Sequence, residues 1–238
     1  MKIGIIGLGK MGMNMVLRLL QDGHEVVANT RTESKVDKAA EEGAIPCYDP
    51  AKIPDHLQGR KVVWVMVPAG KPVDDMIEKV VPTMSEGDII IDGGNSNFHD
   101  TKRRHETLAH KGINYLDVGT SGGVWGLEVG YCLMIGGPRE AFEHVEPVFK
   151  TLAPEDGYHY CGPSGSGHFV KMVHNGIEYG MLQAYAEGFE ILRHSEYDLD
   201  FHAISHLWNQ GSVVRSWLLE LAESMFAEDP NLDDLTGY

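Results

Sequence analysis

Few cysteines and no long apolar run occur in this sequence, and each absence excludes a class of protein. The three cysteines, Cys47, Cys132 and Cys161, are scattered among 238 residues without a CxxC pair, so we expect free thiols rather than a disulfide framework. The apolar stretch near the start is too short to cross a bilayer and soon gives way to glycines. The sequence therefore predicts a cytoplasmic protein with no signal peptide and no membrane association.

Basic side chains are also scarce, with 20 lysines and arginines against 35 aspartates and glutamates and a formal net charge of -15. A protein that binds nucleic acid through its phosphates needs a basic surface, so we expect no nucleic-acid partner. A few local donors can still hold one small anionic molecule. The twelve histidines include no HExxH pattern, and no metal site is predicted.

Strand-like and helix-like segments alternate over the first two thirds of the sequence. Runs typical of buried strands occupy residues 2–7, 25–30, 60–68, 87–94, 112–119 and 131–137. Segments with helical periodicity lie between them, at residues 11–21, 73–84, 98–112 and 138–153. This alternation predicts an α/β fold of the Rossmann type, a doubly wound and mostly parallel sheet with helices on both faces.

The pattern changes at residues 161–167, a segment of glycine, serine and proline that is typical of a linker. Residues 168–194 then form one long helical pattern, and residues 200–226 supply one or two more helices, with Asp200 as the N-cap. We therefore predict two domains, an α/β domain over 1–163 and an all-helical domain over 164–238.

A GxGxxG motif follows the first predicted strand and opens the first helix, which is the context in which this motif binds a dinucleotide. Gly7 permits a tight turn, Gly9 lets the backbone approach a pyrophosphate, and Gly12 lets helix and strand pack closely. The helix N-terminus offers free N–H groups to the phosphates. The predicted cofactor-binding turn comprises Gly7, Leu8, Gly9, Lys10, Met11 and Gly12.

The end of the second predicted strand indicates which dinucleotide binds. An acid there would bind a ribose hydroxyl of NAD, but the sequence has Asn29, Thr30, Arg31 and Thr32. An arginine with neighbouring hydroxyls suits the 2′-phosphate of NADP, so these residues favour NADP over NAD. The alternative for Arg31 is a solvated surface charge.

Two further glycine-rich corners follow predicted strands, DGGNS at residues 92–96 and TSGG at residues 120–123. Ligands bind at the carboxyl ends of strands in open α/β sheets. Each corner alone is compatible with an ordinary turn, but two of them beside a dinucleotide motif indicate a substrate cleft. The candidate substrate-binding residues at these corners are Asn95, Ser121, Gly122 and Gly123.

One flank of the helix predicted over residues 168–194 is polar. Residues spaced three, four or seven apart lie on the same side of a helix, and polar residues occur at these spacings. This flank carries Lys171, His174, Asn175 and Glu178, with Tyr179 at its edge. The other side is apolar or small and is expected to pack; it carries Met172, Val173, Gly176, Ile177 and Gly180. A neutral lysine can take a proton from an alcohol during hydride transfer, and a carboxylic acid can donate one afterwards. The alternative is a routine charge pair on a solvated face.

The segments GLGKMG, DGGNSNF, SGG and GHFVKMVHNGIEYG together resemble 6-phosphogluconate dehydrogenase, a decarboxylating family among the β-hydroxyacid dehydrogenases. The resemblance implies oxidation of 6-phospho-D-gluconate to D-ribulose 5-phosphate and CO₂, with reduction of NADP or NAD. It implies that Lys171 is the general base and that Glu178 protonates the enediol. It also implies a homodimer or homotetramer.

The remaining contacts are assigned through the same resemblance. The carboxylate and hydroxyls of the substrate would be held by Asn95, Ser121, Gly122, Gly123, His174 and Asn175, and its phosphate by Tyr179 and Arg215. The cofactor would also contact Val67, Pro68, Ala69 and Asn95. A surface salt bridge is the alternative for Arg215.

Some positions depart from the family pattern. Val124 and Trp125 follow the SGG where many members have two acids, and Pro68 stands where many have a lysine. Both departures resemble the short bacterial or archaeal form, which often prefers NAD. The helical domain also looks truncated at its C-terminus, so we expect poor turnover. Two other functions stay open, a non-decarboxylating β-hydroxyacid dehydrogenase and a non-catalytic dinucleotide-binding or redox-sensing module.

Overall fold

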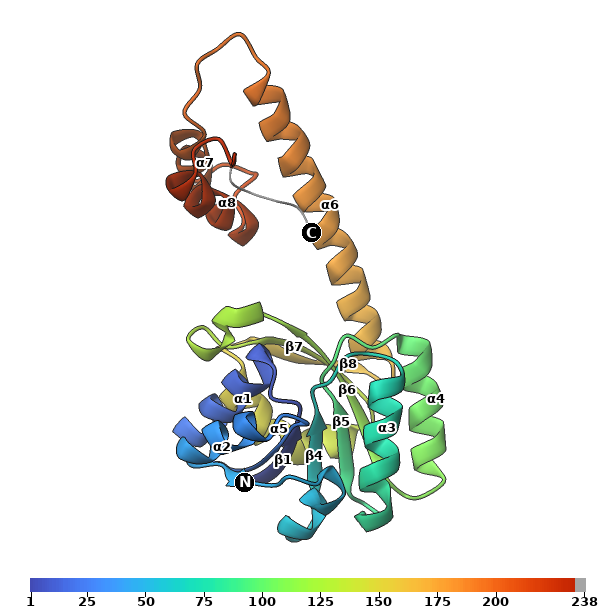
Figure 1. Ribbon diagram of the computed structural model, residues 1–238. Helices are drawn as coiled ribbons and strands as arrows, with labels where there is room; N and C mark the ends of the chain where they lie inside the picture. The colour runs from blue at the N-terminus through green and yellow to red at the C-terminus, as the bar shows by residue number, and fades with distance from the viewer. Residues whose placement is uncertain (234–238) are drawn as a thin grey trace. The chain divides into compact units, whose positions relative to one another are not determined.

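The computed structural model describes residues 1–233, which belong to two compact units (Figure 1). The first unit is Met1–Val173 and the second is His174–Tyr238. The division falls inside one long helix, α6 (Ser166–Arg193). The domain boundary that the sequence predicts near residue 163 stays a prediction.

The first unit is built on one eight-stranded sheet with the order β3-β2-β1-β4-β5-β6-β7-β8. The strands are β1 (Lys2–Ile6), β2 (Glu25–Asn29), β3 (Ile45–Pro46), β4 (Val62–Val65), β5 (Ile89–Asp92), β6 (Asn114–Ser121), β7 (Cys132–Gly136) and β8 (Tyr158–Gly162). Every neighbouring pair is parallel except β6 and β7. The predicted doubly wound, mostly parallel sheet is confirmed. Its strand order reverses between β1 and β4, the point at which such sheets bind ligands.

Helices cover both faces of this sheet, as Figure 1 shows. One face packs against α1 (Lys10–Gln21), α2 (Glu33–Glu41) and α5 (Arg139–Leu152). The other packs against α3 (Lys71–Val80), α4 (Phe98–Ala109) and the 3-10 helix η1 (Pro50–His56). Because the central strands are covered on both sides, their sequences are almost continuously apolar, and all four residues of β4 are buried. Two short 3-10 helices, η2 (Val81–Thr83) and η3 (Gly123–Leu127), complete the unit.

The elements that the sequence analysis did not predict have weak patterns. Helix α2 buries only Val36 and Ala39, so its sequence carries little apolar periodicity. Strand β8 lies at the edge of the sheet and none of its residues is fully buried. The prediction of a linker over residues 161–167 was wrong, because Cys161 and Gly162 end β8 and α6 begins at Ser166.

The second unit contains the rest of α6 together with α7 (Phe201–Asn209) and α8 (Trp217–Glu228). The predicted long helix is confirmed, and so is the N-cap Asp200, whose carboxylate accepts a hydrogen bond from the Ala203 N–H at 2.9 Å. An aromatic cluster with ring centroids 4.8–6.2 Å apart joins the helices; it consists of Phe189, Phe201, Trp208 and Phe226. Within residues 1–233, no helix has both the length and the apolar character that crossing a membrane requires. The three cysteines are free, as predicted, and the cytoplasmic location stays a prediction.

The apolar side of α6 does not pack as the sequence predicts. Met172, Val173 and Ile177 are 47%, 45% and 60% exposed, whereas Lys171 on the polar flank is only 7% exposed. The expectation of a packed apolar side was therefore wrong for the chain as described. Periodicity identifies which side of a helix is apolar, but it does not say whether the same chain covers that side.

Candidate active site

A cavity of about 610 Å³ lies where β1, β2 and β4 end. The Gly7 N–H donates to the Asn29 carbonyl at 2.8 Å, and the Met66 N–H donates to the Ile6 carbonyl at 2.7 Å, so the three strand ends are bonded together. The predicted cofactor residues that line the cavity are Gly7, Leu8, Gly9, Asn29, Thr30, Arg31, Thr32, Val67 and Pro68. Those that do not line it are Lys10, Met11, Gly12, Ala69 and Asn95.

The glycine turn has the geometry that a bound pyrophosphate requires. Gly7 has a φ of 108°, and a Cβ there would lie 2.2 Å from the Met66 carbonyl oxygen. A Cβ on Gly12 would lie 1.9 Å from the Gly7 carbonyl oxygen, whereas nothing lies within 4 Å of a Cβ on Gly9. Gly9 is the N-cap of α1 and has no side-chain capping bond. The first N–H groups of α1 are therefore available beside the cavity, and the turn fits NAD or NADP.

Several lining residues were not predicted from the sequence. Besides Ile6 and Met66 at the strand ends, seven of them are Lys35, Tyr48, Pro50, Pro72, Asp75, Met76 and Lys79. They come from α2, from α3 and from the segment after β3, none of which carries a nucleotide-binding motif. The Tyr48 hydroxyl donates to Asp37 at 2.7 Å, which fixes the ring at the edge of the cavity. Only the folding of three separate segments over the strand ends brings these side chains together.

Asn29 and Arg31 have different roles, although they are two residues apart. Asn29 is 3% exposed and its amide donates to the Cys47 carbonyl at 2.7 Å, so this side chain organises the protein. Arg31 is exposed. In the part of the chain that the structure describes, its side chain forms no hydrogen bond or ion pair. The guanidinium group is therefore available to an anion at the cavity.

The two glycine-rich corners lie side by side at the carboxyl edge of the sheet. Strands β5 and β6 pair in parallel with Asp92 opposite Asp117, and the Thr120 hydroxyl donates to the Gly93 carbonyl at 3.5 Å. Asn95 is exposed in the first corner, and residues 121–123 are partly exposed in the second. The structure thus brings the predicted substrate-binding residues of both corners to one edge.

Asp92 is an organising residue that the sequence analysis did not identify. It is 1% exposed and accepts hydrogen bonds from the Gly94 N–H at 3.1 Å, the Ser96 hydroxyl at 2.7 Å and the Tyr115 hydroxyl at 2.9 Å. Burial raises the pKa of Tyr115 well above its ordinary value, so this hydroxyl stays protonated and donates. An acid that ends a buried strand was the signal available in the sequence.

Lys171 is held against β6 by the first turn of α6. The buried Asp117 carboxylate accepts hydrogen bonds from the Gly165 N–H at 2.8 Å and the His168 N–H at 2.9 Å. Lys171 lies so close to β6 that a Cβ added to Gly119 would be 2.4 Å from the Cβ of Lys171. Gly119 precedes Ser121 by two positions, so the structure brings Lys171 next to the second glycine corner.

The other polar residues predicted on α6 interact with each other. His174 Nδ1 lies 3.7 Å from Glu178 Oε2 and 3.2 Å from Asn175 Oδ1. The side chains of His174 and Glu178 are 37% and 40% exposed. Tyr179 is exposed on the same helix, and Arg215 is exposed between α7 and α8. The sequence analysis placed Glu178 on the same flank as Lys171 but did not predict that Glu178 would pair with His174.

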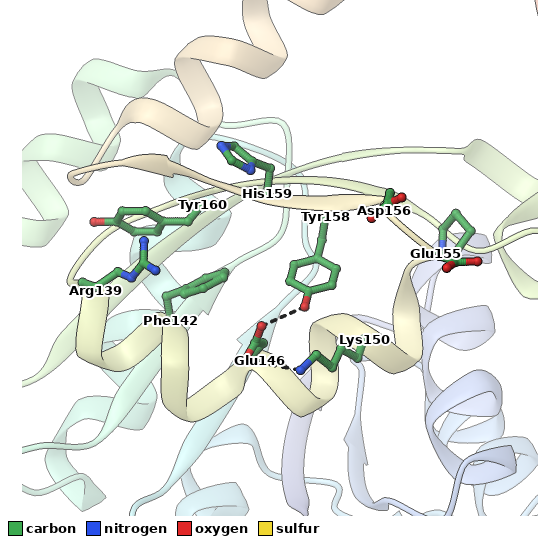
Figure 2. A pocket seen from close by; sticks show the side chains of 10 residues that line it. Arg139, Phe142, Glu146, Lys150, Glu155, Asp156, Tyr158, His159 and Tyr160 are labelled. Atoms are coloured by element: carbon green, nitrogen blue, oxygen red, sulfur yellow. Dashed lines mark hydrogen bonds and ion pairs between the residues drawn. The ribbon is translucent and has the colours of Figure 1, made fainter.

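A second hollow, of about 490 Å³, lies between α5 and β8 (Figure 2). Figure 2 shows Glu146 bonded to both Tyr158 and Lys150, at 2.8 Å and 3.5 Å. Arg139 lies over the Tyr160 ring, 4.8 Å from its centroid, and pairs with Glu143. None of the sequence-predicted site residues lines this hollow. Because its main charged groups pair with one another, we place the active site at the first cavity and the adjacent corners.

The fold and the cavity together define a class, that of dinucleotide-binding oxidoreductases of the Rossmann type. The family described as the NAD binding domain of 6-phosphogluconate dehydrogenase matches residues 2–162, and the one described as the 6-phosphogluconate dehydrogenase C-terminal domain matches residues 167–196. A relative from Haloferax volcanii named 6-phosphogluconate dehydrogenase, NAD(+)-dependent, decarboxylating, is 48% identical over 230 residues, which cover 96% of this chain and 76% of the relative. The chain belongs to the 6-phosphogluconate dehydrogenase family, as its motifs suggest.

Solved structures have the same fold. The 6-phosphogluconate dehydrogenase of Plasmodium falciparum, described with its cofactor NADP+ and its substrate 6-phosphogluconate, aligns with a TM-score of 0.87 at 33% identity; the match covers 99% of this chain and 52% of that one. The 3-hydroxyisobutyrate dehydrogenase of Mycobacterium tuberculosis aligns with a TM-score of 0.76 at 25% identity over 91% of this chain and 72% of that one. Against the Plasmodium enzyme, the chain therefore spans about half the length.

The contact between Gly119 and Lys171 predicts the effect of adding one methyl group. Gly119→Ala should lower the free energy of unfolding by about 1–3 kcal/mol, because the new Cβ must push the Lys171 side chain and the first turn of α6 away from β6. Urea unfolding followed by circular dichroism measures this change.

The matched control is Gly188→Ala, in the interior of α6, where a Cβ meets nothing within 4 Å. It should leave stability unchanged or raise it by about 0.5–1 kcal/mol, because alanine favours the helix. Equal stability of the two variants would contradict the close seating of Lys171 against β6.

Proposed function

We propose that this oxidoreductase oxidises 6-phospho-D-gluconate to D-ribulose 5-phosphate and CO₂, and that NADP or NAD is reduced in the reaction. The observation that carries the proposal is the position of Lys171, which is buried against Gly119 of β6. Gly119 lies two residues before Ser121 in the second glycine corner, and β6 belongs to the sheet whose other strand ends form the dinucleotide cavity. The names of the relatives support the substrate and the decarboxylation.

In the proposed reaction, Lys171 acts in its neutral form and accepts the proton of the C3 hydroxyl as the C3 hydride leaves the substrate. The bound dinucleotide supplies the hydride acceptor. Oxidation makes a β-keto acid, and Lys171, now protonated, donates a hydrogen bond to the new ketone as the bond between C2 and the C1 carboxylate breaks. C1 leaves as CO₂, and C2 of the substrate becomes C1 of the enediol. Glu178 then gives a proton to C1 of the enediol, and its pairing with His174 supports a role in proton transfer.

The substrate is proposed to lie along the edge formed by the two corners. Asn95, Ser121 and the N–H groups of residues 122–123 would hold its carboxylate and hydroxyls, together with His174 and Asn175. Tyr179 and Arg215 are proposed to contact its phosphate, since both are exposed and can donate hydrogen bonds to an anion.

The reaction itself is tested by supplying 6-phosphogluconate with NADP and with NAD, and by measuring both the reduced cofactor and CO₂. We expect equal amounts of both products. Lys171→Met should still bind the dinucleotide but lose at least about 100-fold in kcat, because the general base is absent.

Other outcomes favour the alternatives. Oxidation without CO₂ would mean a non-decarboxylating β-hydroxyacid dehydrogenase, a class represented by the Mycobacterium tuberculosis structure. Dinucleotide binding without any turnover would mean a non-catalytic binding module.

For the cofactor, we propose NADP, because Arg31, Lys35 and Lys79 line the cavity and the adjacent strand ends in Asn29 rather than in an acid. Arg31→Ala should lower kcat/KM for NADP about 10-fold and leave that for NAD unchanged, because only NADP carries the 2′-phosphate. Lys38→Ala, on the exposed side of α2 and outside the cavity, is the matched control. Equal losses with the two cofactors would contradict the assignment.

We also propose that the chain self-associates through the apolar side of α6, where Ile177 and Ile191 are 60% and 72% exposed. Burial of such side chains is favourable by about 25 cal/mol for each Å² of apolar surface removed from water. Analytical ultracentrifugation should show a dimer or tetramer that Ile191→Lys dissociates. A wild-type protein that sediments as a monomer would contradict the proposal.

A further inference from the structure

One buried cation connects the cofactor side of the site with the substrate side. Arg104, on α4, is 3% exposed. Its guanidinium lies between the loop that follows β4 and the corner that follows β5. A buried arginine is costly unless its donors are used, and the contacts of Arg104 fall into two sets that belong to two different parts of the site.

The first set fixes the cofactor rim, residues 67–72. Arg104 Nη2 donates to the Gly70 carbonyl at 3.0 Å, and Nε donates to Asp74 Oδ1 at 2.8 Å. Hydrogen bonding from Arg104 also holds the pKa of Asp74 below its usual range. Gly70 has a φ of 84° and separates Pro68 from Pro72, both of which line the dinucleotide cavity. The position of this rim therefore depends on Arg104.

The second set fixes the substrate corner, residues 92–96. Arg104 Nη1 lies 3.4 Å from Asp92 Oδ2 and 3.4 Å from the Ser96 hydroxyl. These distances are long for hydrogen bonds, so the interaction with the buried Asp92 acts largely through charge. Asp92 in turn accepts from the Gly94 N–H and the Ser96 hydroxyl. Asn95 lies between these two residues and is exposed.

We propose that Arg104 is a positioning residue that holds the cofactor rim and the substrate corner in one fixed relation. The planar fork of an arginine can serve both sets at once, whereas a lysine at this position offers a single ammonium group. A shift of about 1 Å between reacting groups can cost about 100-fold in rate. The substrate half of this inference rests on the proposed function; the cofactor half rests only on dinucleotide binding.

The test compares Arg104→Lys and Ser96→Ala with the neighbouring variant Arg103→Met. Arg103 also bonds to Asp74, at 3.1 Å, but its side chain is 55% exposed, and its bonds go to Asp74 and Asp100 rather than to Gly70 or Asp92. Each variant is assayed for NADPH binding by fluorescence and for kcat and KM with 6-phosphogluconate. The temperature is chosen so that melting curves show every variant fully folded.

Arg104→Lys should weaken NADPH binding about 10-fold and lower kcat by about 10- to 100-fold, because both sets of contacts are disturbed. Ser96→Ala should lower kcat/KM for 6-phosphogluconate about 10-fold and leave NADPH binding unchanged, because it disturbs only the substrate corner. Arg103→Met should stay within about twofold of the wild type in both assays, because it loses only an exposed ion pair.

A purely structural role for Arg104 would lower the melting temperature and leave the kinetics of the folded enzyme unchanged, and that result would overturn the proposal. If Arg104→Lys does not fold, Ser96→Ala decides, and unchanged kinetics in that variant would overturn the substrate half. Weakened NADPH binding in Arg104→Lys, together with a wild type that does not oxidise 6-phosphogluconate, would support the cofactor half and overturn the proposed function.

Discussion

The site depends first on the hydrogen bonds between Asp117 and the start of α6. The carboxylate lies under the first turn of the helix and accepts from two N–H groups that would otherwise have no partner. The approach is possible because Gly167 has no side chain; a Cβ there would lie 2.5 Å from the Asp117 carbonyl oxygen. This junction determines where α6 begins and which strand its second turn contacts. Lys171 occupies that second turn, so its position beside Gly119 follows from the junction.

The N-termini of α1 and α6 differ in what satisfies their N–H groups. One has a partner within the protein, and the other is available to a ligand. An N-terminus attracts a negative group because of its unpaired N–H groups and its dipole. In α6 the protein supplies that group itself, as Asp117. In α1 the N-cap is Gly9, which has no side-chain capping bond and lies at the cavity. The first helix is therefore the one left for a phosphate, in agreement with the NAD binding family that matches residues 2–162.

The parts of this structure that could be predicted from the sequence are those in which local residue choice reflects a local constraint. Apolar runs predicted β1, β4 and β5, and the spacing of Gly7, Gly9 and Gly12 predicted the turn, because each pattern is needed by the backbone at that place. Asp92 ends a buried strand, and that position was the signal available for it in the sequence. The roles of Asp117 and Arg104 could not be predicted in this way, because in sequence both look like surface charges and only tertiary pairing buries them. Asn29 is a similar case, since its amide turned inward to Cys47.

Neutralisation of these acids explains how a chain with a net charge of -15 can offer a site to an anion. At the carboxyl edge of the sheet, Asp92 faces Arg104 and Asp117 faces the positive end of α6. Asp75, at the dinucleotide cavity, pairs with Lys71. Because these carboxylates are already paired, the groups exposed at the two corners are the Asn95 amide and the glycine turn with its backbone N–H groups. At the cavity, Arg31 is exposed. Charges elsewhere on the surface act weakly there, because salt screens exposed charges beyond about 8–10 Å. The local pairing of acids, rather than the overall charge, therefore determines which ligands the site can accept.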